Sequence, residues 1–239
     1  MIIGPKNWHR VGNLIDLSEI EFVIINILKK IKCKNLALSG GIDSTLMLSL
    51  MIKAFAATEI KCFNIALSED HPDYIFSEIA ARFFKVGLEH FVPYGKLLKK
   101  KSDFSGDEIV REFYNCLKRR RVESVIACDG IDEFNAGYYD HMKSPTEETY
   151  YDFIRRFQTE QLIPLNKNSG KIKIHLPYIF DEVLFCWMQI PLFEKIDKLN
   201  RKKVVYKLAE RNDVPEEIIN RRKYGFCDAM IIKDNLYES

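Results

Sequence analysis

The stretch Ser39-Gly40-Gly41-Ile42-Asp43-Ser44 decides the fold, because it joins a strand-like run to a helix-like run. The residues before it, at 35–38, are short, apolar and unbroken, which is typical of a buried parallel strand. Apolar residues over 45–57 recur at helical spacing and predict a helix there. The order is therefore strand, glycine turn, helix.

This turn has the composition of a phosphate-binding site. Two glycines let the backbone approach an anion closely, and a helix start offers unpaired N–H groups and the positive end of the helix dipole. Ser39 and Ser44 add hydroxyl donors, and Asp43 adds a carboxylate that can hold magnesium against phosphate oxygens. No lysine follows Gly41, so the Walker pattern does not apply. A serine- and glycine-rich helix start without a ligand is the alternative that remains open.

The bulk composition predicts a folded chain without a strong polyanion-binding field. The 239 residues are 47% hydrophobic and 29% charged, with a formal net charge of +2. Basic clusters at 99–101 and 119–121 have acidic neighbours, so we expect solvated helix ends rather than a nucleic-acid surface. Nucleic acid is thus a disfavoured partner, although it is not ruled out.

The cysteine pattern and the N-terminal residues predict a cytoplasmic protein. The six cysteines are scattered and contain no C-x-x-C pair, which argues against a zinc or iron–sulfur site and fits reduced thiols in the cytosol. We see no secretory signal at the start. No apolar run approaches the roughly 18 residues that a membrane span needs, so no membrane partner is expected.

Strand and helix patterns alternate over the first part of the chain. Strands are predicted at 36–39, 61–66, 88–92 and 123–127, with helices at 45–57, 73–84 and 107–119. A first helix is expected from about Glu19, with Ser18 as its N-cap. Strands separated by helices predict an α/β fold in which a parallel twisted sheet has helices on both faces.

After about residue 140 the chain becomes mostly helical. Helices are predicted at 147–158, 181–189, 202–211 and 215–220, with a polar loop at 166–170. We expect a single domain over 1–239, with a nucleotide-binding α/β core at about 30–140 and a helical part at about 141–239 that closes the site.

A second motif follows the fourth predicted strand, Ala127-Cys128-Asp129-Gly130-Ile131-Asp132-Glu133, with Gly137-Tyr138 shortly after. Three carboxylates within five residues are electrostatically costly unless a cation or a proton-transfer role compensates them. An acidic helix cap is an equally good reading of this motif alone. A phosphate-binding turn at the end of another strand favours function, because ligands bind at the carboxyl ends of parallel strands.

A third motif, Asn220-Arg221-Arg222-Lys223-Tyr224-Gly225-Phe226, follows Val214-Pro215. In isolation such a basic run is more often a solvated face, and Arg221 is expected to be a solvated neighbour of Lys223.

Taken in order, the motifs resemble the synthetase domain of the asparagine synthetase family, and the first resembles the pyrophosphate loop of the N-type ATP pyrophosphatases. That family carries S-G-G-x-D-S, G-E-G-S-D-E with G-G-Y, R-x-P-F-L-D, a lysine-led helix and P-x-x-(I/V)-x-x-R-x-K. The first motif matches fully, the second in part and 176–181 loosely, while Lys203 and 215–223 match well. The resemblance covers roughly residues 30–230 and implies an adenine nucleotide alpha hydrolase-like fold.

The chain departs from the family pattern at several positions. Asp129 stands where the family has a glutamate associated with proton transfer, and Ile131 replaces a serine. Ala127-Cys128 replaces Ser-Gly, and the arginine before Pro177 is missing. Full-length asparagine synthetases also begin with a glutaminase domain, and we expect none in this chain.

The resemblance implies an ATP-dependent ligase that uses magnesium. A carboxylate would attack the α-phosphorus of ATP, giving an acyl-adenylate and pyrophosphate, and a nitrogen nucleophile would then form an amide and release AMP. The implied catalytic residues are Lys223, Asp129 and Lys203, with Tyr138 as a neighbour, and the implied metal ligands are Asp43 and Asp132. Nucleotide contacts are implied for Ser39, Gly40, Gly41, Asp43, Ser44, Ile65, Ala127 and Gly130.

The nitrogen donor is left open by this resemblance. It is free ammonia, an amine, or ammonia from a separate glutaminase subunit. Two other functions are open as well: a nucleic-acid- or nucleobase-modifying ATP pyrophosphatase, and a degenerate nucleotide-binding relative without catalysis.

Overall fold

The computed structural model describes residues 16–93, 100, 103 and 106–221. Within that part of the chain five strands form one parallel sheet in the order β3-β2-β1-β4-β5. The strands are β1 (Asn35–Ala37), β2 (Lys61–Ile65), β3 (Gly87–Phe91), β4 (Ser124–Ile126) and β5 (Lys173–His175). The central strand β1 pairs Leu36 with Cys62 on one side and with Ile126 on the other.

Helices connect the strands and continue after them. Up to β4 they are α1 (Leu17–Ile31), α2 (Ile42–Ala54), a 3-10 turn η1 (Ala57–Glu59), α3 (Pro72–Phe84) and α4 (Asp107–Arg119). Between β4 and β5 lie α5 (Ile131–Phe134), α6 (Tyr139–Lys143), α7 (Glu147–Phe157), a π-helical turn η2 (Gln158–Leu162) and α8 (Ile163–Ser169). After β5 come η3 (Pro177–Ile179), α9 (Asp181–Gln189), α10 (Leu192–Lys195), α11 (Lys203–Arg211) and α12 (Glu216–Ile219).

The two faces of the sheet carry separate apolar cores. On β2, Cys62 packs into a core with α1, α2 and α3, whereas Phe63 and Ile65 pack into a second core with α4. Successive side chains of a strand point to opposite faces, and the last four residues of β2 are all buried, so this strand is covered on both sides. The predicted fold class, a parallel sheet with helices on both faces and a mostly helical C-terminal part, is confirmed.

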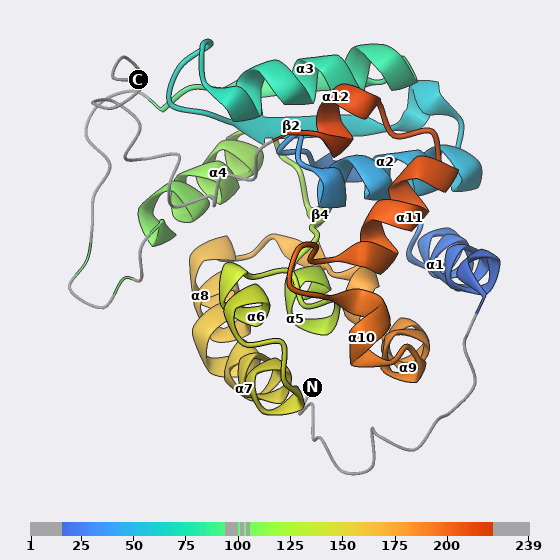
Figure 1. The fold of residues 1–239 in the computed structure, drawn as a ribbon. Helices are drawn as coiled ribbons and strands as arrows, with labels where there is room; N and C mark the ends of the chain where they lie inside the picture. The colour runs from blue at the N-terminus through green and yellow to red at the C-terminus, as the bar shows by residue number, and fades with distance from the viewer. Residues whose placement is uncertain (1–15, 94–99, 101–102, 104–105, 222–239) are drawn as a thin grey trace.

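The helices after β4 form a further layer, and the last of them pack against α2. In Figure 1 the helices from α5 to α8 gather on the side of the molecule away from α3, whereas α11 and α12 lie against α2. A buried hydrogen bond of 2.8 Å from Ser49 Oγ to the carbonyl of Asn212 joins α2 to the end of α11. The C-terminal helices, although far away in sequence, are therefore fixed beside α2 and the glycine turn that precedes it.

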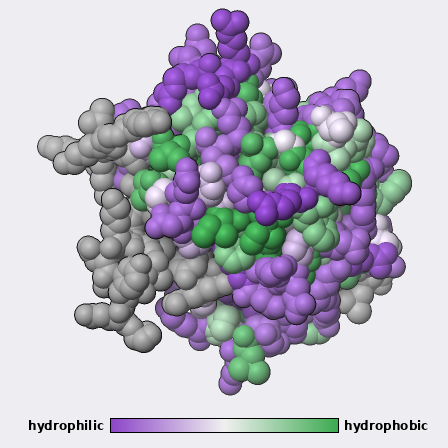
Figure 2. Space-filling model, turned by 90° about the horizontal axis from the view of Figure 1, so that it is seen from above, coloured by the Kyte–Doolittle hydropathy of each residue, from purple (hydrophilic) through white to green (hydrophobic). Residues whose placement is uncertain are grey.

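The outer surface over α3 and α12 is mostly hydrophilic. Figure 2 looks down on this side and shows a smaller hydrophobic area among hydrophilic residues. The helix α3 exposes Ile75 and Phe83. Among the described residues, no helix combines the length and the apolar character that crossing a bilayer requires.

Most predicted elements are present. The short helices α5, α6 and α10 were not predicted, and three further details differ. The polar loop predicted at 166–170 lies mainly in α8, because Asn168 and Ser169 are buried where α8 packs against α4. The strand β5 was not predicted, since its three residues show no clear apolar run. The N-cap of α1 is Asp16, whose carboxylate accepts from the Ser18 N–H at 2.9 Å, so Ser18 is not the cap.

Candidate active site

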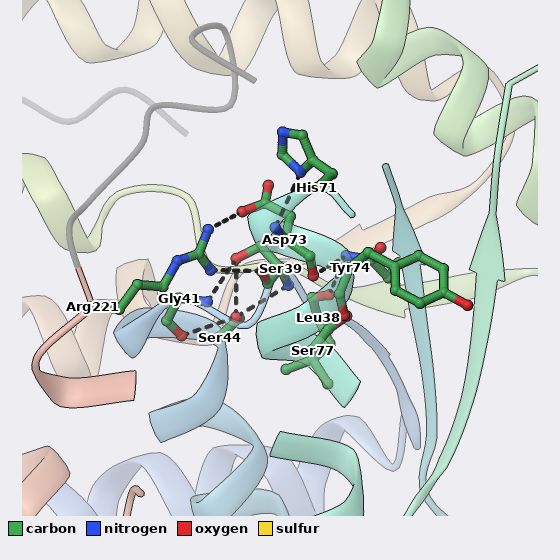
Figure 3. A network of polar contacts seen from close by, with 10 residues as sticks. Leu38, Ser39, Gly41, Ser44, His71, Asp73, Tyr74, Ser77 and Arg221 are labelled. Carbon is green, nitrogen blue, oxygen red and sulfur yellow. Dashed lines mark hydrogen bonds and ion pairs between the residues drawn. The ribbon is translucent and has the colours of Figure 1, made fainter. Parts of the chain in front are cut away.

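The predicted phosphate-binding turn, residues 39–44, lies between β1 and the start of α2, and its own serines hydrogen-bond across it. Ser39 Oγ lies 3.1 Å from Ser44 Oγ and accepts from the Gly41 N–H at 3.3 Å, as Figure 3 shows. Ser44 Oγ also lies 3.2 Å from the Gly41 carbonyl, to which it donates. Gly40 has a φ of +70°, and a Cβ there would collide with the backbone of Phe76 and Ser77 in α3. Glycine is therefore required for both the backbone conformation and the close approach.

An acidic turn follows β4 and faces the same space. Glu133 is buried and accepts a hydrogen bond from Tyr138 Oη at 2.5 Å. Burial, with a contribution from Asp132, raises the pKa of Glu133 to about 7. Burial likewise raises the pKa of Asp129. This turn thus places acidic groups in a dry environment, where their charge is costly.

Lys202 joins the two turns. Its Nζ lies 2.6 Å from both carboxylate oxygens of Asp43 and 2.7 Å from Asp132 Oδ1, with only 2% of the side chain exposed. Burial alone would lower the pKa of Lys202, but the carboxylates of Asp132 and Asp43 outweigh it and raise the pKa. The Lys202 ammonium therefore offsets the negative charge of Asp43 and Asp132, the two carboxylates that were predicted to lie close together.

Gly137 makes this arrangement sterically possible. A Cβ at Gly137 would collide with the Asp132 carboxylate and with the stem of Lys202. Glycine is thus needed at 137 because the Asp132 and Lys202 side chains approach the backbone closely, and not because of an unusual backbone conformation.

Two adjoining cavities of about 390 and 360 Å³ form the candidate cleft. Both are lined by the residues Ser39, Asp43, Cys128, Asp129, Asp132 and Gln161. The first extends along the ends of β1 and β2, past Leu38 and Ile65, to α4 and α8. The second extends toward Lys202, Tyr138 and Arg221. The cleft thus has one arm at the strand ends and a second, charged arm beneath α11 and α12, which is lined by more charged side chains than the first.

The structure brings most of the predicted site residues together. The cleft is lined by Ser39, Gly41, Asp43, Ser44, Ile65, Ala127, Asp129, Gly130 and Asp132, and Gly40 forms the turn beside them. Lys223 lies outside the described residues.

Lys203 is placed away from the cleft. Its Nζ lies 3.1 Å from the Phe193 carbonyl and 3.1 Å from Asp197. Lys202, one residue earlier, has a left-handed backbone with a φ of 55° and caps α11, which directs its side chain inward. The lysine of this motif that reaches the site is therefore Lys202. Adjacent lysines at a helix start give no sequence signal that separates them.

Arg221 differs from its prediction as a solvated neighbour. Its side chain is 6% exposed, pairs with Asp73, and donates to the Ser39 carbonyl at 3.1 Å. Sequence reasoning also missed Tyr178, whose Oη donates to the Asp43 carbonyl at 2.9 Å. These contacts join residues far apart in sequence, so no local pattern marks them.

The donor set fits magnesium that arrives with phosphate. No group of three or more His, Cys, Asp or Glu side chains able to hold a metal occurs among the described residues. Asp43 and Asp132 nevertheless lie within reach of one cation, since both contact Lys202 Nζ. Magnesium is commonly held by one or two carboxylates together with substrate phosphates.

A parallel α/β protein with a phosphate-type glycine turn and a facing acidic turn is the class that this fold and cleft define. The asparagine synthase family signature matches residues 35–170, and the chain belongs to that family. A probable glutamine-hydrolysing asparagine synthetase of Acanthamoeba polyphaga mimivirus is 22% identical over 227 residues. That alignment covers 84% of this chain and 41% of the relative, so the chain spans about two fifths of the relative's length.

Solved structures show the same fold. The structure of NMN synthetase from Francisella tularensis superimposes with a TM-score of 0.51 at 15% identity. The match covers 89% of this chain and 77% of that one. It confirms the predicted adenine nucleotide alpha hydrolase-like arrangement of sheet and helices.

Proposed function

We propose that this chain is an ATP-dependent amide ligase that forms AMP and pyrophosphate. It adenylates a substrate carboxylate and transfers the acyl group to ammonia or an amine. The observation that carries the proposal is the contact of Lys202 with both Asp43 and Asp132, which unites the phosphate turn and the acidic turn in one cleft. Membership of the asparagine synthase family supports the reaction class.

The two arms of the cleft suit the two ends of ATP. The arm past Leu38 and Ile65 is lined by fewer charged side chains than the other arm, and it suits the adenosine moiety. The N-terminus of α2 and the hydroxyls of Ser39 and Ser44 are donors for the β- and γ-phosphates. This orientation places the α-phosphorus near Ala127 and Gly130, beside the acidic turn.

Charge stabilisation is assigned to Lys202 and Lys223. An ammonium aimed at developing negative charge stabilises a transition state more strongly in a dry cleft than in water. Asp43 and Asp132 would hold magnesium, which when bound offsets the charge of the departing pyrophosphate. Because Lys202 Nζ contacts both of these carboxylates, its ammonium lies beside the proposed magnesium ligands, where phosphate charge would arrive.

Asp129 is the proposed base for the nitrogen nucleophile. It lines both arms of the cleft, and its burial raises its pKa, which makes it a stronger base than an exposed aspartate. The donor in this proposal is ammonia, an amine, or ammonia from a separate glutaminase subunit. The substrate is a small-molecule carboxylate.

A pyrophosphate-release assay tests the proposal. The chain is incubated with MgATP and a panel of carboxylates, with ammonium, without it, and with RNA in place of the carboxylates. We expect release that depends on both a carboxylate and a nitrogen donor, and loss of at least tenfold in Asp43→Asn. Release that depends on RNA alone would assign the chain to the nucleic-acid-modifying class. No release with any substrate, despite MgATP binding, would indicate a non-catalytic relative.

A further inference from the structure

Two side chains, Asn64 and Arg221, donate hydrogen bonds to backbone carbonyls at the start of the phosphate turn. Both side chains also contact Asp73. Asn64 Nδ2 donates to the Leu38 carbonyl at 2.9 Å and lies 3.3 Å from the backbone carbonyl of Asp73. Arg221 donates to the next carbonyl, that of Ser39, and pairs with the Asp73 carboxylate. Two successive carbonyls before the glycines are therefore tied to the first turn of α3 (Figure 3).

The ion pair between Arg221 and Asp73 is well shielded from water. The two side chains are 6% and 9% exposed, and the Arg221 guanidinium lies over the Phe76 ring at 4.7 Å. The planar guanidinium donates to two acceptors at once while stacking on the ring, which a lysine ammonium cannot reproduce. Asp73 is itself fixed, because its N–H donates to His71 Nδ1 at 3.0 Å.

Both members of the pair also line the charged arm of the cleft. Without Arg221, an unpaired carboxylate would face the space in which phosphates are proposed to bind. The pair therefore fixes the turn that borders this space, and each member keeps the other in place.

The geometry points to Arg221 and Asp73 as a positioning pair for the phosphate turn. The pair sets the phosphate affinity of the cleft by holding the Ser39 carbonyl against α3. This inference rests on the proposed function, since it concerns the binding of the nucleotide's β- and γ-phosphates.

Isothermal titration calorimetry on conservative variants tests the pair. Three ligands are titrated: MgATP, magnesium pyrophosphate, and AMP, which lacks the β- and γ-phosphates. Arg221→Lys is expected to weaken MgATP and magnesium pyrophosphate binding at least tenfold and AMP binding less than twofold. Asp73→Asn, which keeps the side-chain shape, should act in the same direction on the same two ligands.

The matched control is Arg211→Lys. Arg211 pairs with Glu21 at 2.7 Å, between α11 and α1, and does not line the cleft. The Arg211→Lys variant should bind MgATP, magnesium pyrophosphate and AMP with the same affinities as the parent chain. The double variant D73N/R221K should bind MgATP and magnesium pyrophosphate about as tightly as whichever single variant binds them less tightly. We expect this because the two residues act as one unit.

Several results would overturn the inference. Arg221→Lys binding MgATP as tightly as Arg211→Lys would remove Arg221 from this role. If a variant bound AMP and magnesium pyrophosphate more weakly by the same factor, the substitution would have loosened the fold in general. If the losses of affinity in the two single variants added up in the double variant, the two residues would act separately. If Arg221→Lys did not fold, Asp73→Asn alone would decide between these results. If the parent chain bound neither MgATP nor magnesium pyrophosphate, the proposed function would fall with the inference, whereas parent binding with unchanged variants overturns the inference alone.

Discussion

Lys202 shows how one residue can determine the electrostatics of this cleft. Two carboxylates that converge in a dry site repel each other and are costly unless a cation lies between them. The Lys202 ammonium contacts both Asp43 and Asp132 and is almost fully buried. Removing one partner from a buried ion pair leaves uncompensated charge, which typically costs about 3–5 kcal/mol.

The neighbouring lysines Lys202 and Lys203 provide a matched comparison. We expect Lys202→Ala to lower kcat/KM for pyrophosphate release about a hundredfold or more and to reduce the free energy of unfolding by about 3 kcal/mol. Lys203→Ala should change the unfolding free energy by about 1 kcal/mol or less, because its ion pair with Asp197 is partly exposed. Initial rates and urea unfolding of both variants check this. A larger rate loss in Lys203→Ala than in Lys202→Ala would contradict the placement.

At the scale of elements, strong patterns made the sheet and its crossovers predictable. Four strands with their crossover helices follow from apolar runs and helical spacing, and the bounds of α4 and α9 coincide with the predicted 107–119 and 181–189. The phosphate turn and the acidic turn were predictable because each follows a buried strand of one parallel sheet.

The rest of the site was not predictable because tertiary packing determines it. The three-residue strand β5 gains its partners from β4, and the polar helix α8 is stabilised by α4. Whether Lys202 or Lys203 points inward depends on the left-handed backbone at the start of α11. The ion pair between Asp73 and Arg221 joins α3 to the end of α12, which no local periodicity reports.

The junction of α7 and α10 contains a buried lysine without a carboxylate partner among the described residues. Lys195 is 1% exposed, and its Nζ donates to Tyr150 Oη at 2.7 Å and lies 4.8 Å from the ring centroid. Burial lowers the pKa of Lys195 to about 7. Burial also raises the pKa of Tyr150 well above its usual value, so the phenol stays neutral.

This lysine gives the stability of the fold a definite pH dependence. Between pH 7 and about 10.4, the ordinary pKa of lysine, the unfolded chain binds the Lys195 proton more readily than the folded chain. The contribution of Lys195 therefore makes the unfolding free energy rise with pH in that window, by at most about 1.4 kcal/mol per pH unit.

Lys195→Met should remove this contribution. We expect the variant to be more stable than the parent at pH 7, with the difference shrinking toward pH 10 because the burial cost applies to the charged form. Urea unfolding at pH 7, 8, 9 and 10 measures it. The same difference between variant and parent at every pH would show that Lys195 is not buried as a titrating group.

At the scale of the whole molecule, the candidate active site is formed by the carboxyl ends of the inner strands β1 and β4 together with the C-terminal helices. The two turns follow strands of the sheet, whereas Lys202 caps α11 and Arg221 follows α12. Both helices lie against α2 (Figure 1). Neither part alone contains the charged arm of the cleft. We therefore expect cleavage of ATP to require the C-terminal helices as well as the α/β core.

The identity of the nucleotide product tests the central claim most directly. The chain is incubated with ATP labelled at the α-phosphate, magnesium, a carboxylate that supports pyrophosphate release, and ammonium, and the nucleotides are separated by chromatography. Our account predicts AMP as the labelled product, in amounts equal to the pyrophosphate released, and its loss in Lys202→Ala. ADP as the main labelled product would contradict the account, because it would mean cleavage between the β- and γ-phosphates rather than at the α-phosphorus.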